Sequence, residues 1–194
     1  MKIKLSTFAL VLTLSFGAFH ARAGTIVGPI INPANGHTYF LLSQNTWTAS
    51  ESEALTLGGH LATVNDATEN DWIYDTFGGA TRNLWIGYND IALEGTFVWA
   101  DGSTSNFTNW NLGQPDNAGG TQDAAYIFSA AASYPNFVGR KWDDVVPTDT
   151  AAGLGTPVPL HGVVEVVPEP SAYLMIVASS FAFCGFRFRS RAAQ

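Results

Sequence analysis

The sequence predicts an α+β domain, and three observations support this fold class. Between residues 24 and 167, helical patterns occur only over residues 48–77, strand patterns dominate from residue 84 onward, and residues 106–121 form a polar stretch without periodicity. Helices early and strands late in one chain are typical of α+β folds. The chain has 194 residues, which is long enough for one sizeable domain and short for two.

Two helices are predicted in the first half of the domain. Thr48 and Glu51 have the spacing of a capping box, which opens a helix over Thr48–Leu57. Asp66 and Glu69 have the same spacing and open a second helix, and a Gly-Gly pair ends each of the two. The residues expected to face the core are Trp47, Ala54, Leu55, Trp72, Ile73, Thr76 and Phe77.

Strands are predicted where short apolar runs are bounded by Gly, Asn or Asp. The stretch Asn106–Thr121 has no such pattern, and a loop of this length inside a compact domain is usually functional or disordered. The predicted strands are His37–Ser43, His60–Val64, Leu84–Tyr88, Thr96–Trp99, Ala124–Ser129, Lys141–Trp142 and Gly162–Val167.

The charge of the chain is unevenly distributed. The net charge of −7 hides a central segment, residues 24–170, which carries three basic residues and all 16 acidic ones, a net charge of −13. Such an acidic surface repels phosphate backbones, so we expect no nucleic-acid partner. Metal cations and neutral ligands are the partners that this charge favours. All six Trp residues lie in the same segment, which indicates a folded core.

Both ends of the chain have the pattern of targeting segments. Residues 1–23 read as a secretory signal peptide, because two lysines precede an apolar stretch and Ala21-Arg22-Ala23 has the form of a cleavage site. We therefore expect an exported protein with a globular domain over residues 24–167. Near the other end, the apolar run Ala172–Phe186 precedes three arginines and is expected to form a short transmembrane helix with a basic tail.

Residues 168–194 resemble the PEP-CTERM sorting signal of Gram-negative bacteria. The match consists of Pro168-Glu169-Pro170, the apolar helix and the cluster of arginines. The resemblance implies recognition and cleavage by an exosortase. It also implies an inner-membrane anchor before processing, followed by release to the cell surface or the exopolysaccharide (biofilm) matrix.

Between these segments, an ordered series of motifs resembles the C-type lectin-like domain. Each motif is weak alone, but their order and approximate spacing hold across most of residues 37–167. The resemblance implies two helices, two small antiparallel sheets and a long calcium-binding loop. The motifs are Gly58-Gly59-His60-Leu61-Ala62-Thr63-Val64, Glu69-Asn70, Leu84-Trp85-Ile86-Gly87 with Asn89-Asp90, Glu94-Gly95 with Phe97, Trp99 and Asp101-Gly102, Asn109-Trp110, Gln114-Pro115-Asp116, Trp142-Asp143-Asp144 and His161–Glu165.

The resemblance also implies calcium as the cofactor and a carbohydrate as the ligand. Calcium takes oxygen ligands, and the stretch 106–121 is rich in Asn, Asp and Gln and has no His or Cys. The resemblance further implies a cis peptide bond before Pro115. Carried over residue by residue, the sugar-binding calcium site consists of Gln114, Asp116, Gln122, Asp143 and Asp144, and a second calcium site of Asp90, Glu94, Asn117 and Asp123.

Three features depart from the family pattern. Gln122 stands where the family usually has Glu, and Asp143 stands where it usually has Asn. The two changes offset in charge, but Asp143 lacks the amide N–H donors that an Asn would offer to a sugar hydroxyl. The paired cysteines are absent, with Ala54, Ala124 and Val164 near their places, so no disulfide is expected. Gln-Pro-Asp resembles the galactose-preferring subgroup, but residues 117–121 lack the aromatic ring that usually stacks on the sugar.

Three functions are compatible with these residues. The leading hypothesis is a calcium-dependent carbohydrate-binding protein of the cell envelope or its polysaccharide matrix. The alternative is a lectin-like fold that binds a protein or acts as a structural matrix component, since a fold does not fix a function. A glycosidase is the third, because Asp143 and Asp144 near Asp116 resemble a catalytic carboxylate pair. Clustered loop carboxylates beside amides suit a cation better, so we expect no enzymatic activity.

Overall fold

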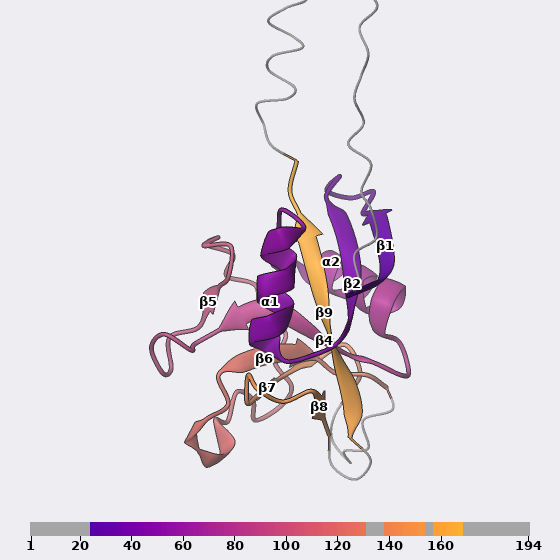
Figure 1. The fold of residues 1–194 in the computed structure, drawn as a ribbon. Coiled ribbons are helices and arrows are strands. Elements are labelled where there is room, and N and C mark those ends of the chain that lie inside the picture. Colours follow the sequence, from indigo (N-terminus) through magenta and orange to yellow (C-terminus); the bar gives the residue numbers. More distant parts are fainter. Residues whose placement is uncertain (1–23, 131–137, 154–156, 169–194) are drawn as a thin grey trace, which may run out of the picture.

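The computed structural model describes residues 24–130, 138–153 and 157–168 (Figure 1). The expected signal peptide, the expected membrane helix 172–186 and the basic tail lie outside these residues. Within the three described ranges, no helix combines the length and the apolar character needed to cross a bilayer. The targeting segments therefore remain predictions.

Two helices and a mixed sheet make up the domain, which confirms the α+β class. The helices are α1 (Trp47–Thr56) and α2 (Ala67–Ile73), and α2 continues into one π-helical turn, η1 (Tyr74–Gly78). The strands are β1 (Thr25–Ile31), β2 (Thr38–Gln44), β3 (His60–Leu61), β4 (Asn83–Asn89), β5 (Val98–Trp99), β6 (Ala124–Ile127), β7 (Trp142–Val145), β8 (Ala151–Ala152) and β9 (Val158–Val166).

The parallel pairing of β4 with β9 joins the strands into one mixed sheet. The order is β1-β2-β9-β4-β6-β7, with β3 and β8 also paired to β9 and β5 paired to β4. The neighbours are antiparallel except β4 and β9, which run parallel with Leu84 opposite His161. The antiparallel group built on β9 and the one built on β4 therefore share a hydrogen-bonded centre (Figure 1).

The first helix begins earlier than its predicted cap. Thr46 is the N-cap, because its hydroxyl oxygen accepts the Ala49 N–H at 3.2 Å, so the prediction of a cap at Thr48 is wrong. Glu51 does not complete a capping box. Its carboxylate instead accepts the Leu61 N–H at 2.8 Å and so ties α1 to β3. Leu55, expected in the core, is 55% exposed, since it lies on the outer side of α1.

The second helix begins as predicted. The Asp66 carboxylate accepts the Glu69 N–H at 2.9 Å, as the capping spacing requires. β1 is absent from the predicted strands, because Gly28 and Pro29 interrupt its apolar run. Two register shifts also break its pairing with β2, so no regular alternation marks it in the sequence. The remaining predicted strands occur with shifted ends.

Two fully buried tryptophans define the core on the two faces of the sheet. Trp85 belongs to one apolar cluster and Trp142 to another. Trp85 is paired with Tyr126 and Trp142 with Ile127, and these two successive residues of β6 point to opposite faces of the sheet. The Trp142 indole N–H also donates to the Asn70 side-chain oxygen at 2.7 Å, which ties β7 to α2. A buried aromatic side chain of this kind contributes about 2–3 kcal/mol. β7, which carries two of the predicted ligands, is therefore held firmly in the sheet.

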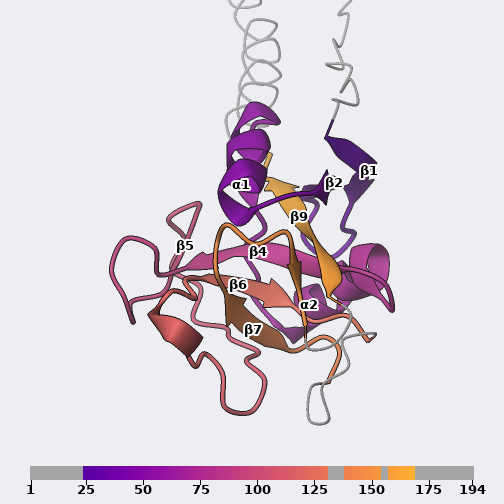
Figure 2. The ribbon, with the colours of Figure 1, turned by 60° about the horizontal axis from the view of Figure 1, so that its bottom comes forward.

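The long loop lies on the far side of the domain from the end of β9. Its short turn, η2 (Ala118–Gly120), lies at the lower left in two views of the ribbon (Figure 1 and Figure 2). In both views the end of β9 lies at the top. The loop and the point where the chain leaves the domain are thus well separated.

Candidate functional site

β7 holds the long loop against the sheet. The Asn111 N–H donates to the Trp142 carbonyl at 2.8 Å, and the Trp142 N–H donates to the Asn109 carbonyl at 3.0 Å. The ring of Trp110, between the two asparagines, packs edge-on against Trp142 with 5.8 Å between centroids. The Gln114–Pro115 peptide bond that follows is cis, as the resemblance implies. The loop then returns over β7.

Asp144 is the side chain on which the loop closes. It is 0% exposed, and its two carboxylate oxygens accept the Asp116 N–H at 3.1 Å and the Asn117 N–H at 2.9 Å. Asn117 has a left-handed backbone conformation, with φ at 44°, which Asn tolerates better than most residues. The structure therefore brings Asp116 and Asp144, two predicted ligands of the sugar-binding site, together.

Gln122 lies at the other end of the same turn. Its side-chain oxygen accepts the Ala118 N–H at 2.6 Å, and an Asp116 oxygen accepts the same N–H at 3.2 Å. The Asn117 side-chain oxygen accepts the Gln122 N–H at 3.1 Å. These bonds gather three predicted ligands around η2, with backbone amides as their donors.

Asp143 has different surroundings from its neighbour Asp144. Successive side chains on a strand point to opposite faces, and Asp143 lies opposite Tyr126 in the antiparallel pairing of β7 with β6. The Tyr126 hydroxyl donates to Asp143 Oδ2 at 3.0 Å. Asp143 is 9% exposed and Tyr126 is 1% exposed. Loop amides thus support Asp144, whereas an aromatic hydroxyl from the core supports Asp143.

Asp90 and Asp123 form the centre of the predicted second site. The Asp90 N–H donates to the Asp123 carbonyl at 3.0 Å, and Asp90 Oδ2 accepts the Gly95 N–H at 2.8 Å. The other oxygen of Asp90 is buried and has no hydrogen-bond partner. Glu94 is exposed in the turn that Asp90 holds. The structure therefore brings Asp90 and Asp123 together and leaves Glu94 at the surface.

Burial raises the pKa of three of these carboxyl groups. The pKa of Asp143 rises to about 7, chiefly because burial disfavours the charged form; the charges of Asp144 and Asp116 add to this, and the Tyr126 hydrogen bond opposes it. Burial is also the main cause that raises the pKa of Asp144. The pKa of Asp123 is raised by burial and then by the charge of Asp90. A divalent cation beside these groups would favour their charged forms.

The chemistry of the donor set fits calcium. The side-chain oxygen of Gln114 and one oxygen of Asp90 are buried without a hydrogen-bond partner, so each can accept a cation. All the predicted ligands offer oxygen, which calcium prefers. Within the part of the chain that the structure describes, no three His, Cys, Asp or Glu side chains form a group that could hold a metal. A calcium ion here would therefore need amide oxygens beside the carboxylates.

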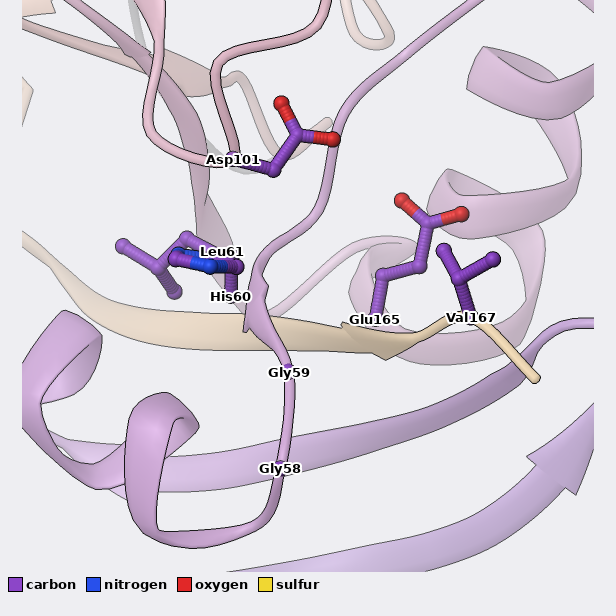
Figure 3. Close-up of a pocket in the computed structure, with 7 residues that line it drawn as sticks. All are labelled: Gly58, Gly59, His60, Leu61, Asp101, Glu165 and Val167. Carbon is purple, nitrogen blue, oxygen red and sulfur yellow. The ribbon is translucent and has the colours of Figure 1, made fainter. Parts of the chain in front are cut away.

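Two cavities lie away from the loop. None of the nine predicted ligands lines either one. The second, of about 440 Å³, is bordered by His37 and Glu69 among others. Figure 3 shows the first, with the carboxylates of Asp101 and Glu165 on the same side of β9. That cavity has a volume of about 320 Å³ and is lined by Gly58, Gly59, His60, Leu61, Asp101, Glu165 and Val167.

Comparison with known proteins places the chain in a family. The family model described as "Lectin C-type domain" matches residues 43–149, more than half of the chain. The chain belongs to the C-type lectin family. This lectin is 29% identical over 146 residues to a perlucin-like protein of Mytilus galloprovincialis, a match that covers 70% of the chain and 88% of the relative.

Two further relatives match about half of this chain. Echinoidin of Heliocidaris crassispina is 33% identical over 107 residues, which cover 53% of this chain and 68% of echinoidin. The galactose-specific lectin nattectin of Thalassophryne nattereri is 30% identical over 103 residues, which cover 52% of this chain and 60% of nattectin.

Solved structures show the same fold. The carbohydrate-recognition domain of the mouse scavenger receptor C-type lectin aligns with a TM-score of 0.54 at 24% identity, over 69% of this chain and 92% of that domain. The C-type lectin CEL-I from Cucumaria echinata aligns with a TM-score of 0.55 at 23% identity, over 69% and 91%. At these identities, the likeness shows the fold alone.

Tyr126 is the residue of the site that the sequence did not indicate. It lies in a predicted strand, where an aromatic residue is ordinarily part of the core. Its contact with Asp143 depends on the register between β6 and β7, which residues 17 positions apart do not reveal locally. The only available signal is that strands 124–129 and 141–142 are consecutive predicted strands, which often pair.

Proposed function

We propose that this lectin is a secreted or surface protein that binds carbohydrate through calcium held by its long loop. The observation that supports the proposal most strongly is the closure of the loop on Asp144. The fully buried carboxylate gathers Asp116 and Asn117, while Gln122 is bonded into the same turn. This arrangement supports a site in which an exposed loop, held on a strand of the sheet, offers oxygen ligands.

The resemblance divides the residues into two groups, although Asn117, assigned to the second, is hydrogen-bonded to Asp144 and Gln122 of the first. Gln114, Asp116, Gln122, Asp143 and Asp144 would hold the sugar-binding calcium, and Asp90, Glu94, Asn117 and Asp123 would contribute to a second ion. Bound calcium would supply open coordination positions for sugar hydroxyls, because it accepts six to eight oxygen ligands. The unpartnered oxygens of Gln114 and Asp90 support one ion in each group.

Galactose-type sugars are the proposed ligand class. Gln114-Pro115-Asp116 matches the motif of the galactose-preferring subgroup, and a relative at 30% identity is named as galactose-specific. No aromatic residue occurs in residues 117–121, so the affinity for a single sugar is expected to be low. Binding to repeated sugars of a polysaccharide would offset this by multivalency.

The proposed setting is the bacterial envelope. The signal peptide predicted over residues 1–23 and the sorting signal predicted over 168–194 support export, membrane anchoring through 172–186, and processing by an exosortase. The loop lies on the far side of the domain from the end of β9 (Figure 1), so an anchor beyond residue 168 leaves the loop accessible. The net charge of −13 over residues 24–170 disfavours nucleic acid as a partner.

Calorimetry and a glycan array, each with calcium and with EDTA, test this function. We expect heat on calcium addition and glycan signals that EDTA abolishes. Asp116→Asn removes a proposed ligand charge, and Asp71→Asn makes the same change at an exposed position on α2. Loss of both signals in Asp116→Asn but not in Asp71→Asn supports the function, and no calcium heat in the unmodified protein contradicts it.

A second candidate is a lectin-like fold that binds a protein or scaffolds the matrix without sugar. The side-chain geometry favours it in one respect, since the described residues contain no group of three acidic or histidine side chains able to hold a metal. A melting temperature that rises with calcium but not with any sugar would support this candidate. We infer no enzymatic activity, and a panel of chromogenic galactosides checks this directly.

A further inference from the structure

Tyr126 contacts the proposed site from the core side of the sheet. Its hydroxyl donates to Asp143 Oδ2 at 3.0 Å, and the two residues lie directly opposite each other on β6 and β7. Side chains opposite each other in an antiparallel pair have Cβ atoms about 4.5–5.5 Å apart. The sheet register therefore fixes this contact, whereas the predicted ligands Gln114 and Asp116 lie on the long loop.

The aromatic neighbours of Tyr126 restrict its ring. The ring packs edge-on against Trp85, with 6.1 Å between centroids, and tilted against Phe128, with 4.9 Å. Tyr126 is 1% exposed, so it cannot change rotamer without disturbing this cluster. Its hydroxyl is accordingly a fixed donor.

The fixed Tyr126 hydroxyl determines the orientation of the Asp143 carboxylate. A carboxylate has about four lone-pair sites, and one hydrogen bond to Oδ2 leaves acceptor capacity for a cation. Asp143 is 9% exposed, and the charges of Asp144 and Asp116 act on its carboxylate. The family usually has Asn here, and an Asn side chain has only one oxygen that could bind the ion. Asp143 has two, so the hydrogen bond from Tyr126 to Oδ2 determines which oxygen remains available.

We propose that Tyr126 is a positioning residue for the calcium site, whose hydroxyl holds the Asp143 carboxylate in the orientation that serves the metal. This inference rests on the proposed calcium function. It assigns to Tyr126 a role that acts through Asp143 rather than through direct contact with the ion or the sugar.

A double-mutant cycle read out by calcium calorimetry tests the inference. Tyr126→Phe removes only the hydroxyl, and we expect the calcium Kd to rise about tenfold, as for a lost hydrogen bond to a charged group. In an Asp143→Ala background the same change is expected to alter Kd less than about twofold, because the partner is gone. Tyr88→Phe, which also removes a hydroxyl from a ring packed among aromatics, is the matched control and is expected to leave Kd unchanged.

Each outcome decides the question. Equal losses in both backgrounds, an unchanged Kd in Tyr126→Phe, or a Tyr126→Phe protein that circular dichroism shows to be unfolded would each overturn the positioning role. If Asp143→Ala abolishes binding, the comparison of Tyr126→Phe with Tyr88→Phe decides alone. If the unmodified protein binds no calcium, the proposed function itself fails. If it binds calcium but the effects of the two substitutions on Kd simply add, only the positioning role of Tyr126 fails.

Discussion

Two groups of buried carboxylates occur in this domain, and the protein satisfies them differently. Glu69 on α2 and Glu165 on β9 share the Tyr39 hydroxyl, at 2.6 Å and 2.9 Å. Every oxygen of the two carboxylates has at least one hydrogen-bond partner in the protein. The further partners are the Asn35 and Asn65 side-chain amides, the Asn65 and Thr63 N–H groups and His37 Nδ1.

The second group lies under the long loop and is less completely satisfied. Asp144 and Asp116 accept amides of the loop itself, and Asp143 accepts the Tyr126 hydroxyl. The side-chain oxygen of Gln114, in the same loop, and one oxygen of Asp90, in the predicted second site, are buried without a hydrogen-bond partner. The comparison teaches that acid burial alone does not mark a cation site. The proposal of a cation site depends instead on buried carboxylate or amide oxygens that lack protein donors, and the described residues offer two such oxygens, on Gln114 and Asp90.

Removing the central carboxylate of the loop group should give the largest effect. Asp144→Asn takes away a buried charge and turns one acceptor into a donor that faces the Asn117 N–H. We expect calcium affinity to fall by at least about 100-fold, since charge count and ligand orientation set calcium affinity. Calorimetry measures this, with Asp71→Asn as the control. Unchanged affinity in Asp144→Asn would mean that the loop group is not the calcium site.

Removing the shared hydroxyl of the other group should change stability but not metal binding. Tyr39→Phe deprives Glu69 and Glu165 of a donor, and we expect the free energy of unfolding to fall by about 2 kcal/mol. Denaturant titration measures the loss. The calcium Kd should stay within about twofold of its original value, since the two groups lie in separate parts of the sheet. A parallel loss of calcium affinity would break the distinction between them.

Adding a charge to the loop group should strengthen binding moderately. Gln122→Glu restores the residue that the family usually has, at a side chain that already accepts the Ala118 N–H. We expect calcium affinity to rise about three- to tenfold, because ligand charge tunes calcium affinity. Asn106→Asp adds the same charge at an exposed position of the same loop and should have a smaller effect. Equal gains in the two variants would point to general electrostatics rather than ligation.

The smallest expected effect is the pH dependence of stability that comes from Glu165, in the group of Glu69 and Glu165. Burial raises the pKa of Glu165, with the charge of Glu69 adding to it, while hydrogen bonds from His37 and Tyr39 oppose it. The native state then holds this proton at pH values where the unfolded chain has released it. Stability relative to Glu165→Gln should therefore fall as pH rises from about 4 through the raised pKa. A difference between the two proteins that stays constant with pH contradicts this.

Local patterns in the sequence predicted a large part of the fold. The Asp66 cap, both helices and the strands around Leu84 and Ala124 are visible because capping and apolar alternation act over a few residues. The parallel pairing of β4 with β9 is not visible. It joins Leu84 to His161, which are far apart in the sequence, and no local pattern specifies such a partner.

The sequence predicted members for the candidate site but did not predict their geometry. The motif series placed Asp116, Asp143 and Asp144 in the site and implied the cis bond before Pro115, which the structure contains. Which face of β7 each acid occupies depends on strand register, which pairs Asp143 with Tyr126 and Asp144 with Ala125, and no local sequence pattern specifies that register. The Tyr126 contact was hidden for the same reason.

Thermal unfolding with calcium and with EDTA tests most directly whether the loop group is a calcium site. A ligand at about 100 times its Kd stabilises the native state by about 2.7 kcal/mol, which raises the melting temperature by several degrees. We predict such a rise with calcium for the unmodified protein, its reversal by EDTA, and no rise for Asp144→Asn. Identical melting temperatures with calcium and with EDTA in the folded, unmodified protein would contradict the account.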